Sequence, residues 1–276
     1  PATCCRLPGP SRPLTLPNPL PMTRVSPRAR LHSSELLRVL ASQGLVDASA
    51  DSGDVGQRLG DWLDFRQAIA LQAFIGSVDD ASTPQAVPTA RVDADVLHRR
   101  FAQVRAALEQ SIVGGSVPAP GLARIELPPV ELEHPIDPKT AFDPFRRHAA
   151  GHQRQMETIL RALRLQLRGM LDKGTDNHRQ LAALDAILDN VLMAREGRLL
   201  GQITSEFEKR FARSLRQHMK QLVQAAQADE PAPRTEPWLA PLRQDLLACL
   251  LAELDLRVQP VLGLIEALSQ ASPQQQ

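Results

Sequence analysis

Aromatic residues are scarce in this chain of 276 residues. It contains no tyrosine, two tryptophans and seven phenylalanines, although 43% of its residues are hydrophobic. The apolar residues are mostly leucine, alanine and valine. Leucine and alanine favour helices, whereas strands are enriched in β-branched and aromatic residues. The composition therefore predicts an all-α protein.

Cysteine and an excess of one charge are lacking as well. The three cysteines, Cys4, Cys5 and Cys249, fit neither an even disulfide framework nor the spacing of metal ligands. They indicate a reducing compartment, and we expect a cytoplasmic protein. With 32 basic and 31 acidic residues the net charge is +1, so affinity for nucleic acid or an anionic membrane has to come from local segments.

Long apolar runs are also absent from the sequence. A signal peptide requires roughly 7 to 15 apolar residues after a basic start, and the sequence shows no such stretch. The most apolar segment, residues 246–268, is interrupted by charged residues and by Pro260, so we expect no transmembrane segment. Residues 1–21 carry seven prolines without apolar periodicity, and we expect them to lie upstream of a true start at Met22.

Proline clusters and helical periodicity divide the chain into parts. Apolar residues recur at helical spacing on both sides of a segment in which six prolines leave little room for helix. Before it, the spacing predicts one helix from Asp54 to Gly76. After it, residues 176–228 lack proline and would be about 80 Å long as a single helix, which either pairs along its length or bends. The predicted parts are a disordered proline-rich lead (1–32), an N-terminal helical bundle (33–113), a proline-rich linker (114–138), long antiparallel coiled-coil-like helices (139–269) and a polar tail (270–276).

The region after the linker combines an apolar stripe with segregated charge. Apolar residues from Met156 to Met170 follow the 4-3-4-3 spacing of a coiled coil, with arginines seven apart along one flank. Residues 144–173 contain seven basic residues against two acidic ones, and residues 195–220 contain seven against three. Residues 229–266 are acidic by contrast, with seven acids and three arginines. The flanking arginines are Arg154, Arg161 and Arg168.

Three interpretations of this charge pattern are open. Basic helices can pack beside the acidic segment within one bundle or dimer, they can present a site to an acidic protein partner, or they can bind the phosphates of nucleic acid or membrane. Aromatic residues interleaved with the basic ones, which favour single-stranded nucleic acid, are nearly absent. We expect a partner site to use four arginines of the first basic segment. These are Arg154, Arg161, Arg164 and Arg168.

No pattern in the sequence predicts a catalytic or cofactor site. The glycine motifs of nucleotide-binding loops and the serine elbow of hydrolases are absent. His148 and His152 stand four apart, as in zinc-protease helices, but HAAGH lacks the catalytic glutamate and indicates no third ligand. We interpret them as solvated histidines on a helix face and as weak candidates for a metal site. Cys249 lies among leucines, where a thiol is usually a small core residue. We expect no cofactor, no metal and no small-molecule substrate.

Parts of the sequence resemble a proteobacterial family of unknown function, DUF3348. The resemblance rests on RLGDWLDFRQAIAL at 58–71, on the proline-rich middle and on FDPFRRHAAGHQRQME at 142–157, and it covers nearly the whole chain from Met22. The family has no assigned activity, so the resemblance implies no catalytic residues. It implies a cytoplasmic accessory of an envelope complex, because genes of the family neighbour those of a proton-channel-like membrane protein and an outer-membrane-anchoring protein.

These patterns together favour a non-enzymatic interaction or scaffold protein. We expect it to associate with itself or with a protein partner through its long C-terminal helices. The alternative is a nucleic-acid-binding accessory protein that uses the basic helices of residues 144–220. An enzyme is the third possibility, since the pair His148 and His152 is the only feature of the sequence that favours one.

Overall fold

A computed structural model describes the chain over residues 34–46, 55–80, 94–115, 121–132, 135–228 and 238–270. These residues form seven helices and no strand, which confirms the all-α prediction. The predicted lead, including Met22, and residues 271–276 of the predicted tail lie outside the described residues. The helices are α1 (Glu35–Ser42), α2 (Val55–Trp62), α3 (Phe65–Asp80), α4 (Ala94–Gly114), α5 (Asp143–Leu171), α6 (Asp176–Ala228) and α7 (Ala240–Gln270).

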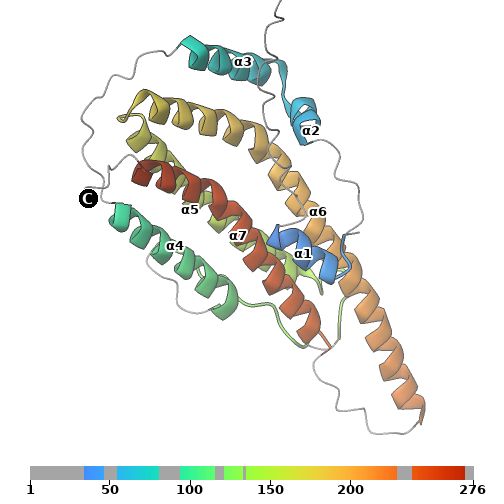
Figure 1. Cartoon of the computed structure of the whole chain (residues 1–276). Coiled ribbons are helices and arrows are strands. Elements are labelled where there is room, and N and C mark those ends of the chain that lie inside the picture. Colours follow the sequence, from blue (N-terminus) through green and yellow to red (C-terminus); the bar gives the residue numbers. More distant parts are fainter. Residues whose placement is uncertain are drawn as a thin grey trace, which may run out of the picture. The chain divides into compact units, whose positions relative to one another are not determined.

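Helix α7 lies at the centre of the packing. It contacts α1, α4, α5 and α6, and Figure 1 shows it in red among these helices. Apolar residues occur on most sides of α7, as expected of a helix that is covered nearly all round. Pro260 does not end the helix, although a proline withholds one backbone N–H. The buried residues of α7 are Leu242, Leu246, Cys249, Leu250, Ala252, Glu253, Leu254, Val258, Val261, Leu264 and Ile265.

The first helices of the chain share this core. The described residues all belong to one compact unit. Helices α1 and α4, which belong to the predicted N-terminal bundle, each pack against α7. Leu40 of α1 and Leu108 of α4 are buried in the same apolar cluster as the residues of α5, α6 and α7. The packing thus joins the two parts of the chain that the proline-rich segment separates in the sequence.

Helices α2 and α3 are separate, so the prediction of one helix from Asp54 to Gly76 is wrong. The break falls at Leu63 and Asp64. The backbone N–H of Gln67 donates to Asp64 Oδ1 at 2.7 Å, and the backbone N–H of Asp64 donates to Gln67 Oε1 at 3.0 Å. This reciprocal capping box starts a new helix. Helix α3 then runs through Gly76 and packs on α6.

Helices α5 and α6 form a hairpin around residues 172–175. The apolar stripe of α5 is buried, as its spacing predicts, and α7 is the helix that α5 contacts most. Ion pairs join α6 to its neighbours, between Arg146 and Glu208 at 2.6 Å and between Arg210 and Asp245 at 2.7 Å. The second pair links the basic part of α6 to the acidic C-terminal helix, in agreement with the bundle interpretation of the charge pattern.

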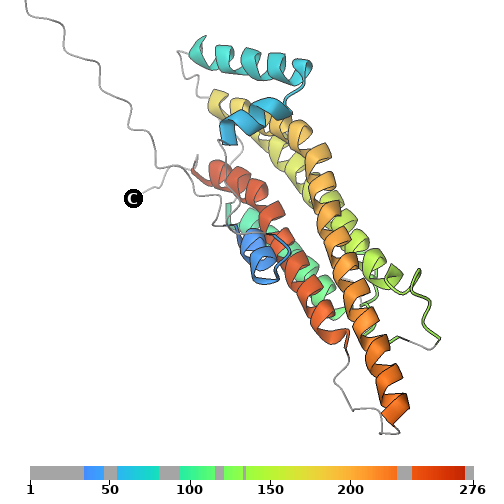
Figure 2. The same ribbon diagram turned by 90° about the vertical axis from the view of Figure 1, so that its right-hand side faces the viewer.

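Helix α6 is continuous over its 53 residues. It curves along its length (Figure 1), and its C-terminal end runs on beyond the ends of α5 and α7 in both views (Figure 2). Such a length is uncommon for a helix in a compact domain. The core therefore covers only part of α6, and its C-terminal turns have fewer neighbours.

The described part of the predicted linker packs on α5. Helix α4 ends at Gly114, and Gly115 takes the left-handed backbone conformation with φ +52°, which ends many helices. In the segment 121–132, the backbone N–H of Ala123 donates to Gln155 Oε1 at 3.0 Å. Ile125 of the same segment lies over Gly151 of α5, whose lack of a side chain permits the approach. This segment is a cover for α5.

Candidate functional site

Two of the four predicted partner-binding arginines are used inside the chain. Arg164 and Arg168 stand one turn apart on α5 and pair with Asp185 and Asp189 on α6. The nitrogen–oxygen distances are 2.6 and 2.8 Å for Arg164 and 2.5 and 2.8 Å for Arg168. The four side chains are 11% to 17% exposed. Each aspartate bridges both arginines, so the charge of this four-residue cluster is neutralised on the spot.

The four-residue cluster fixes α5 against α6. Burial acts to lower the pKa of the Arg168 guanidinium, but the hydrogen bonds and charges of Asp189 and Asp185 outweigh it, and the pKa is raised. The two arginines are one turn apart on α5, and the two aspartates are one turn apart on α6. They meet in only one register of the hairpin, and buried ion pairs are known to specify register in this way. The predicted partner-binding set therefore narrows to Arg154 and Arg161, whose side chains are exposed.

His148 and His152 are buried, which corrects the prediction that they are solvated. Each is 1% exposed, and their rings meet edge to face with centroids 4.4 Å apart. The segment 121–132 reaches over them, and the carbonyl oxygen of Glu126 lies 2.9 Å from His148 Nδ1. Burial, and then the charge of His148, lowers the pKa of His152 to about 4. Burial also lowers the pKa of His148, so the site favours the neutral form of both rings.

The described residues offer little to a metal ion or to thiol chemistry. No three His, Cys, Asp or Glu side chains among them lie together in a way that would hold a metal ion. Cys249 is 3% exposed, which confirms the prediction of a core residue. Burial, and then the nearby Glu253, raises the pKa of its thiol to about 12. Across the same described residues, no helix has the length and apolar character needed to cross a membrane.

The apolar stripe of α5 is covered within the chain itself. Met156, Leu160, Leu163 and Leu167 are all at most 7% exposed. The prediction placed the partner face here, on the stripe and its arginine flank. Because the stripe is buried and two of the four predicted partner-binding arginines are paired, a surface for a partner has to be sought elsewhere on the long helices.

An apolar surface on the distal part of α6 was not predicted from the sequence. Phe207, Phe211 and Leu215 are buried along one side of the helix. Beyond Leu215 the same row of every fourth residue continues as Met219 and Val223, which are 42% and 54% exposed, because the row advances about 40° around the helix at each step and turns away from the core. The apolar side of α6 therefore begins in the core and ends in a surface that the described residues leave open.

Basic residues line one edge of this apolar side. At about 100° per residue, Arg213, Arg216 and Lys220 fall within about 60° of one another and next to Val223. Residues 209–228 contain five basic residues and no acidic one. Arg213 donates to the backbone oxygen of Lys209, and no carboxylate of the described residues pairs with these three cations. We call Arg213, Arg216, Met219, Lys220 and Val223 the distal α6 surface.

An aromatic contact fixes α6 close to this surface. Trp238, two residues before α7, lies 5.8 Å from the Phe211 ring and stacks on His218 at 4.9 Å with an interplanar angle of 14°. The basic count of residues 195–220 is the sequence signal that pointed toward the distal α6 surface. That count could not distinguish Arg210, which pairs with Asp245, from the three cations of the distal α6 surface, which pair with no carboxylate of the described residues.

Comparison with known proteins identifies a family and no activity. No curated protein and no solved structure matches the chain. One family model, described as "Protein of unknown function (DUF3348)", matches residues 22–270. The matched span contains all the helices of the described residues. The chain belongs to the DUF3348 family of proteins of unknown function.

Proposed function

We propose that this chain is a non-enzymatic interaction protein that binds a protein partner through the distal α6 surface. The observation that carries the proposal is the apolar side of α6, which is buried as far as Leu215 and then open at Met219 and Val223. Apolar groups that lie together at the surface of a soluble domain commonly mark a binding site. A partner helix laid along α6 would cover them, as helices fill apolar grooves in many complexes.

Charge selects the kind of partner. Arg213, Arg216 and Lys220 stand beside the apolar side chains without an acidic residue between 209 and 228. A second copy of this surface would add positive charge to positive charge, whereas an acidic amphipathic helix would match both its charge and its apolar side. Nucleic acid would meet the three cations but would leave Met219 and Val223 without an apolar contact. We therefore favour a protein with an acidic, partly apolar helix.

Site-specific photo-crosslinking in the native host tests this proposal. A photoreactive amino acid placed at Val223 of the full chain should capture a protein in the soluble or membrane fraction. The matched control is the same amino acid at Ile69 of α3, since Ile69 and Val223 are both 54% exposed. The double substitution Arg216→Glu and Lys220→Glu should abolish the capture at Val223, because it reverses the charge that selects the partner.

Three results would contradict the proposal. Capture of the same proteins at Ile69 would show that any exposed apolar residue suffices. Capture that survives Arg216→Glu with Lys220→Glu would remove the role of charge. Crosslinks to nucleic acid at Val223, lost steeply as salt rises, would support the alternative of a nucleic-acid-binding accessory protein.

A further inference from the structure

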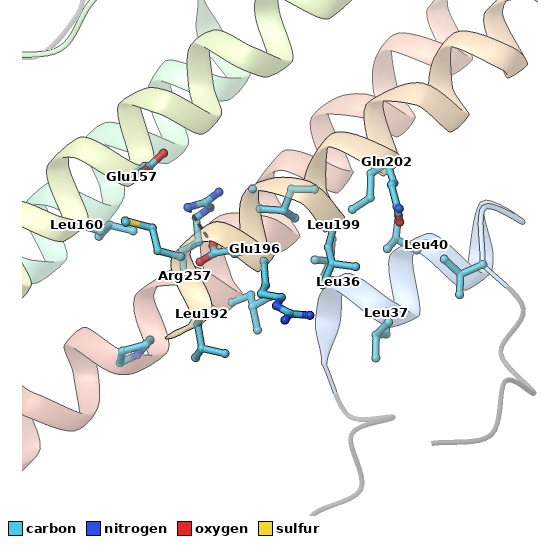
Figure 3. A pocket seen from close by; sticks show the side chains of 18 of the residues that line it. Leu36, Leu37, Leu40, Glu157, Leu160, Leu192, Glu196, Leu199, Gln202 and Arg257 are labelled. Carbon is cyan, nitrogen blue, oxygen red and sulfur yellow. Dashed lines mark ion pairs between the residues drawn. The ribbon is translucent and has the colours of Figure 1, made fainter. Parts of the chain in front are cut away.

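A pocket of about 950 Å³ lies where α1, α5, α6 and α7 meet. Figure 3 shows Leu36 and Leu40 of α1 beside Leu199 of α6, with Leu160 of α5 on the opposite side. Trp62, at the end of α2, also lines it. Pockets that bind small molecules have volumes of roughly 300 to 1,000 Å³ and mostly apolar walls. This pocket is at the upper end of that range.

Large apolar side chains of the pocket wall are open to solvent. They come from α1 and the loop after it, from α6 and from α7. Covering apolar surface contributes roughly 25 cal/mol per Å², so a molecule that covered these side chains together would be held by its own apolar part. The exposed wall residues are Leu37 (39%), Val46 (41%), Met193 (36%), Leu199 (52%) and Leu256 (43%).

Most acidic residues of the wall are already paired. Asp189 belongs to the four-residue cluster with Arg164 and Arg168. Glu196 pairs with Arg257 at 3.0 Å. A third acid, Glu206 of α6, pairs with Lys209 one turn away. Because the charges within these pairs cancel, the net charge of the pocket wall is set by the charged residues that have no such partner.

Two arginines of the wall have no carboxylate partner among the described residues. Arg195 of α6 lies over the Trp62 ring, 5.6 Å from its centroid, and Arg161 projects from α5. Glu157, one turn before Arg161, is the remaining acid of the wall. The unpaired charge of the wall is therefore positive by one, and both cations border apolar side chains.

We propose that this pocket binds an aliphatic chain that ends in an anionic headgroup, either a carboxylate or a phosphate. The chain lies along the leucines of α1 and α6, and the headgroup meets Arg195 and Arg161, since charge-assisted hydrogen bonds from arginine suit both anions. The pocket shares no residue with the distal α6 surface, so this proposal stands apart from the partner site.

Tryptophan fluorescence provides a local readout, because the chain has two tryptophans and one of them lines the pocket. In the full chain with Trp238→Phe, Trp62 is the remaining reporter. Palmitate and hexadecyl phosphate should each cause a saturable change in its emission, and the tighter of the two identifies the headgroup. The reciprocal variant Trp62→Phe, which keeps Trp238, should show no change with either compound.

Two pairs of variants separate the headgroup from the chain. Arg195→Gln should weaken both anions about tenfold, the worth of one charge-assisted hydrogen bond, and should leave hexadecanol binding unchanged. Arg154→Gln, an exposed arginine of α5 outside the pocket wall, is its control. Leu199→Glu should abolish binding of all three compounds, whereas Leu165→Glu, at a leucine 56% exposed outside the wall, should not.

The absence of a saturable signal from Trp62 with both anions would overturn the proposal. An unchanged affinity for palmitate and hexadecyl phosphate in Leu199→Glu would do the same, because it would place the chain elsewhere. If Arg195→Gln weakened hexadecanol as much as the two anions, the headgroup assignment would be wrong. Circular dichroism of each variant shows that its helices are intact, and Arg195→Gln alone keeps the test decisive if Leu199→Glu unfolds.

Discussion

The imidazole rings of His148 and His152 meet edge to face in a buried site, with their centroids 4.4 Å apart. Their Nε2 atoms have no hydrogen-bond partner among the described residues. Burial lowers the pKa of His148, the hydrogen bond with the Glu126 backbone opposes this, and the charge of Arg243 of α7 adds to the lowering. Protonation of both rings would place two positive charges side by side in a buried site.

The histidine pair should make the protein sensitive to acid. The pKa of His152 falls from 6.5 to about 4 on folding, so the unfolded chain binds more protons between these values. The free energy of unfolding is then unaffected by His152 above about pH 6.5, and it decreases as the pH falls toward 4. We expect His152→Leu to remove about 2 kcal/mol of the loss between pH 7 and pH 5, measured by urea unfolding at each pH. The matched control is His98→Leu, at an exposed histidine of α4, and an unchanged slope in His152→Leu would refute the assignment.

The four-residue cluster between α5 and α6 should be a point of high sensitivity. Asp185→Asn leaves two arginines, each less than one fifth exposed, without one of their partners. Loss of one partner in a buried ion pair costs about 3 kcal/mol or more, and we expect a decrease of that size in urea unfolding. The control is Glu206→Gln in the exposed pair with Lys209, where about 0.5 kcal/mol is expected. Equal effects of the two variants would show that the four-residue cluster contributes no more to stability than an exposed ion pair does.

Two glycines should respond to alanine in opposite directions. Gly115 has φ +52°, and a Cβ there would lie 2.9 Å from Leu127 Cγ, so Gly115→Ala should destabilise the protein by about 1 to 2 kcal/mol. Gly197 is inside α6 with nothing within 4 Å of an added Cβ, and Gly197→Ala should stabilise it by about 0.5 to 1 kcal/mol. Thermal unfolding followed by circular dichroism measures both, and a stabilising Gly115→Ala would contradict the described path of the linker.

Cys249 should be inert in the folded protein. It is 3% exposed, and burial raises the pKa of its thiol to about 12, so almost no thiolate exists at pH 8. In the chain with Cys4→Ser and Cys5→Ser, a disulfide reagent at pH 8 should react with Cys249 at the rate of unfolding, and at once in denaturant. Rapid stoichiometric reaction without denaturant would show that α7 is not packed as described.

Local signals in the sequence account for the elements that the prediction captured. The spacing of Met156, Leu160, Leu163 and Leu167 defines the buried side of α5 because a helix brings every third or fourth residue to one side. It does not name the covering helix, which is α7. The break before α3 was readable in Asp64 and Gln67, whose spacing is that of a capping box. It was missed because apolar residues continue at helical spacing across it.

Long-range contacts decide the features of the site that the prediction did not capture. His148 is buried because the segment 121–132 folds back over α5, and no local pattern encodes that return. The pairing of Arg164 with Asp185 could have been predicted, since two arginines one turn apart precede the short turn at residues 172–175 and two aspartates one turn apart follow it. The pocket could not be predicted, because its wall combines residues of α1, α2, α5, α6 and α7 that only the tertiary packing brings together.

The central position of α7 also bears on the order in which the chain is made. Every helix that packs on α7 precedes it in the sequence. At a synthesis rate of roughly 5 to 20 residues per second, the apolar stripe of α5 leaves the ribosome on the order of ten seconds before α7 is complete. In that interval α1 and α4 lack the helix on which they pack, and α5 has only its hairpin partner α6 beside it. We therefore expect a chain that stops before α7 to leave apolar side chains of α1, α4 and α5 open to solvent.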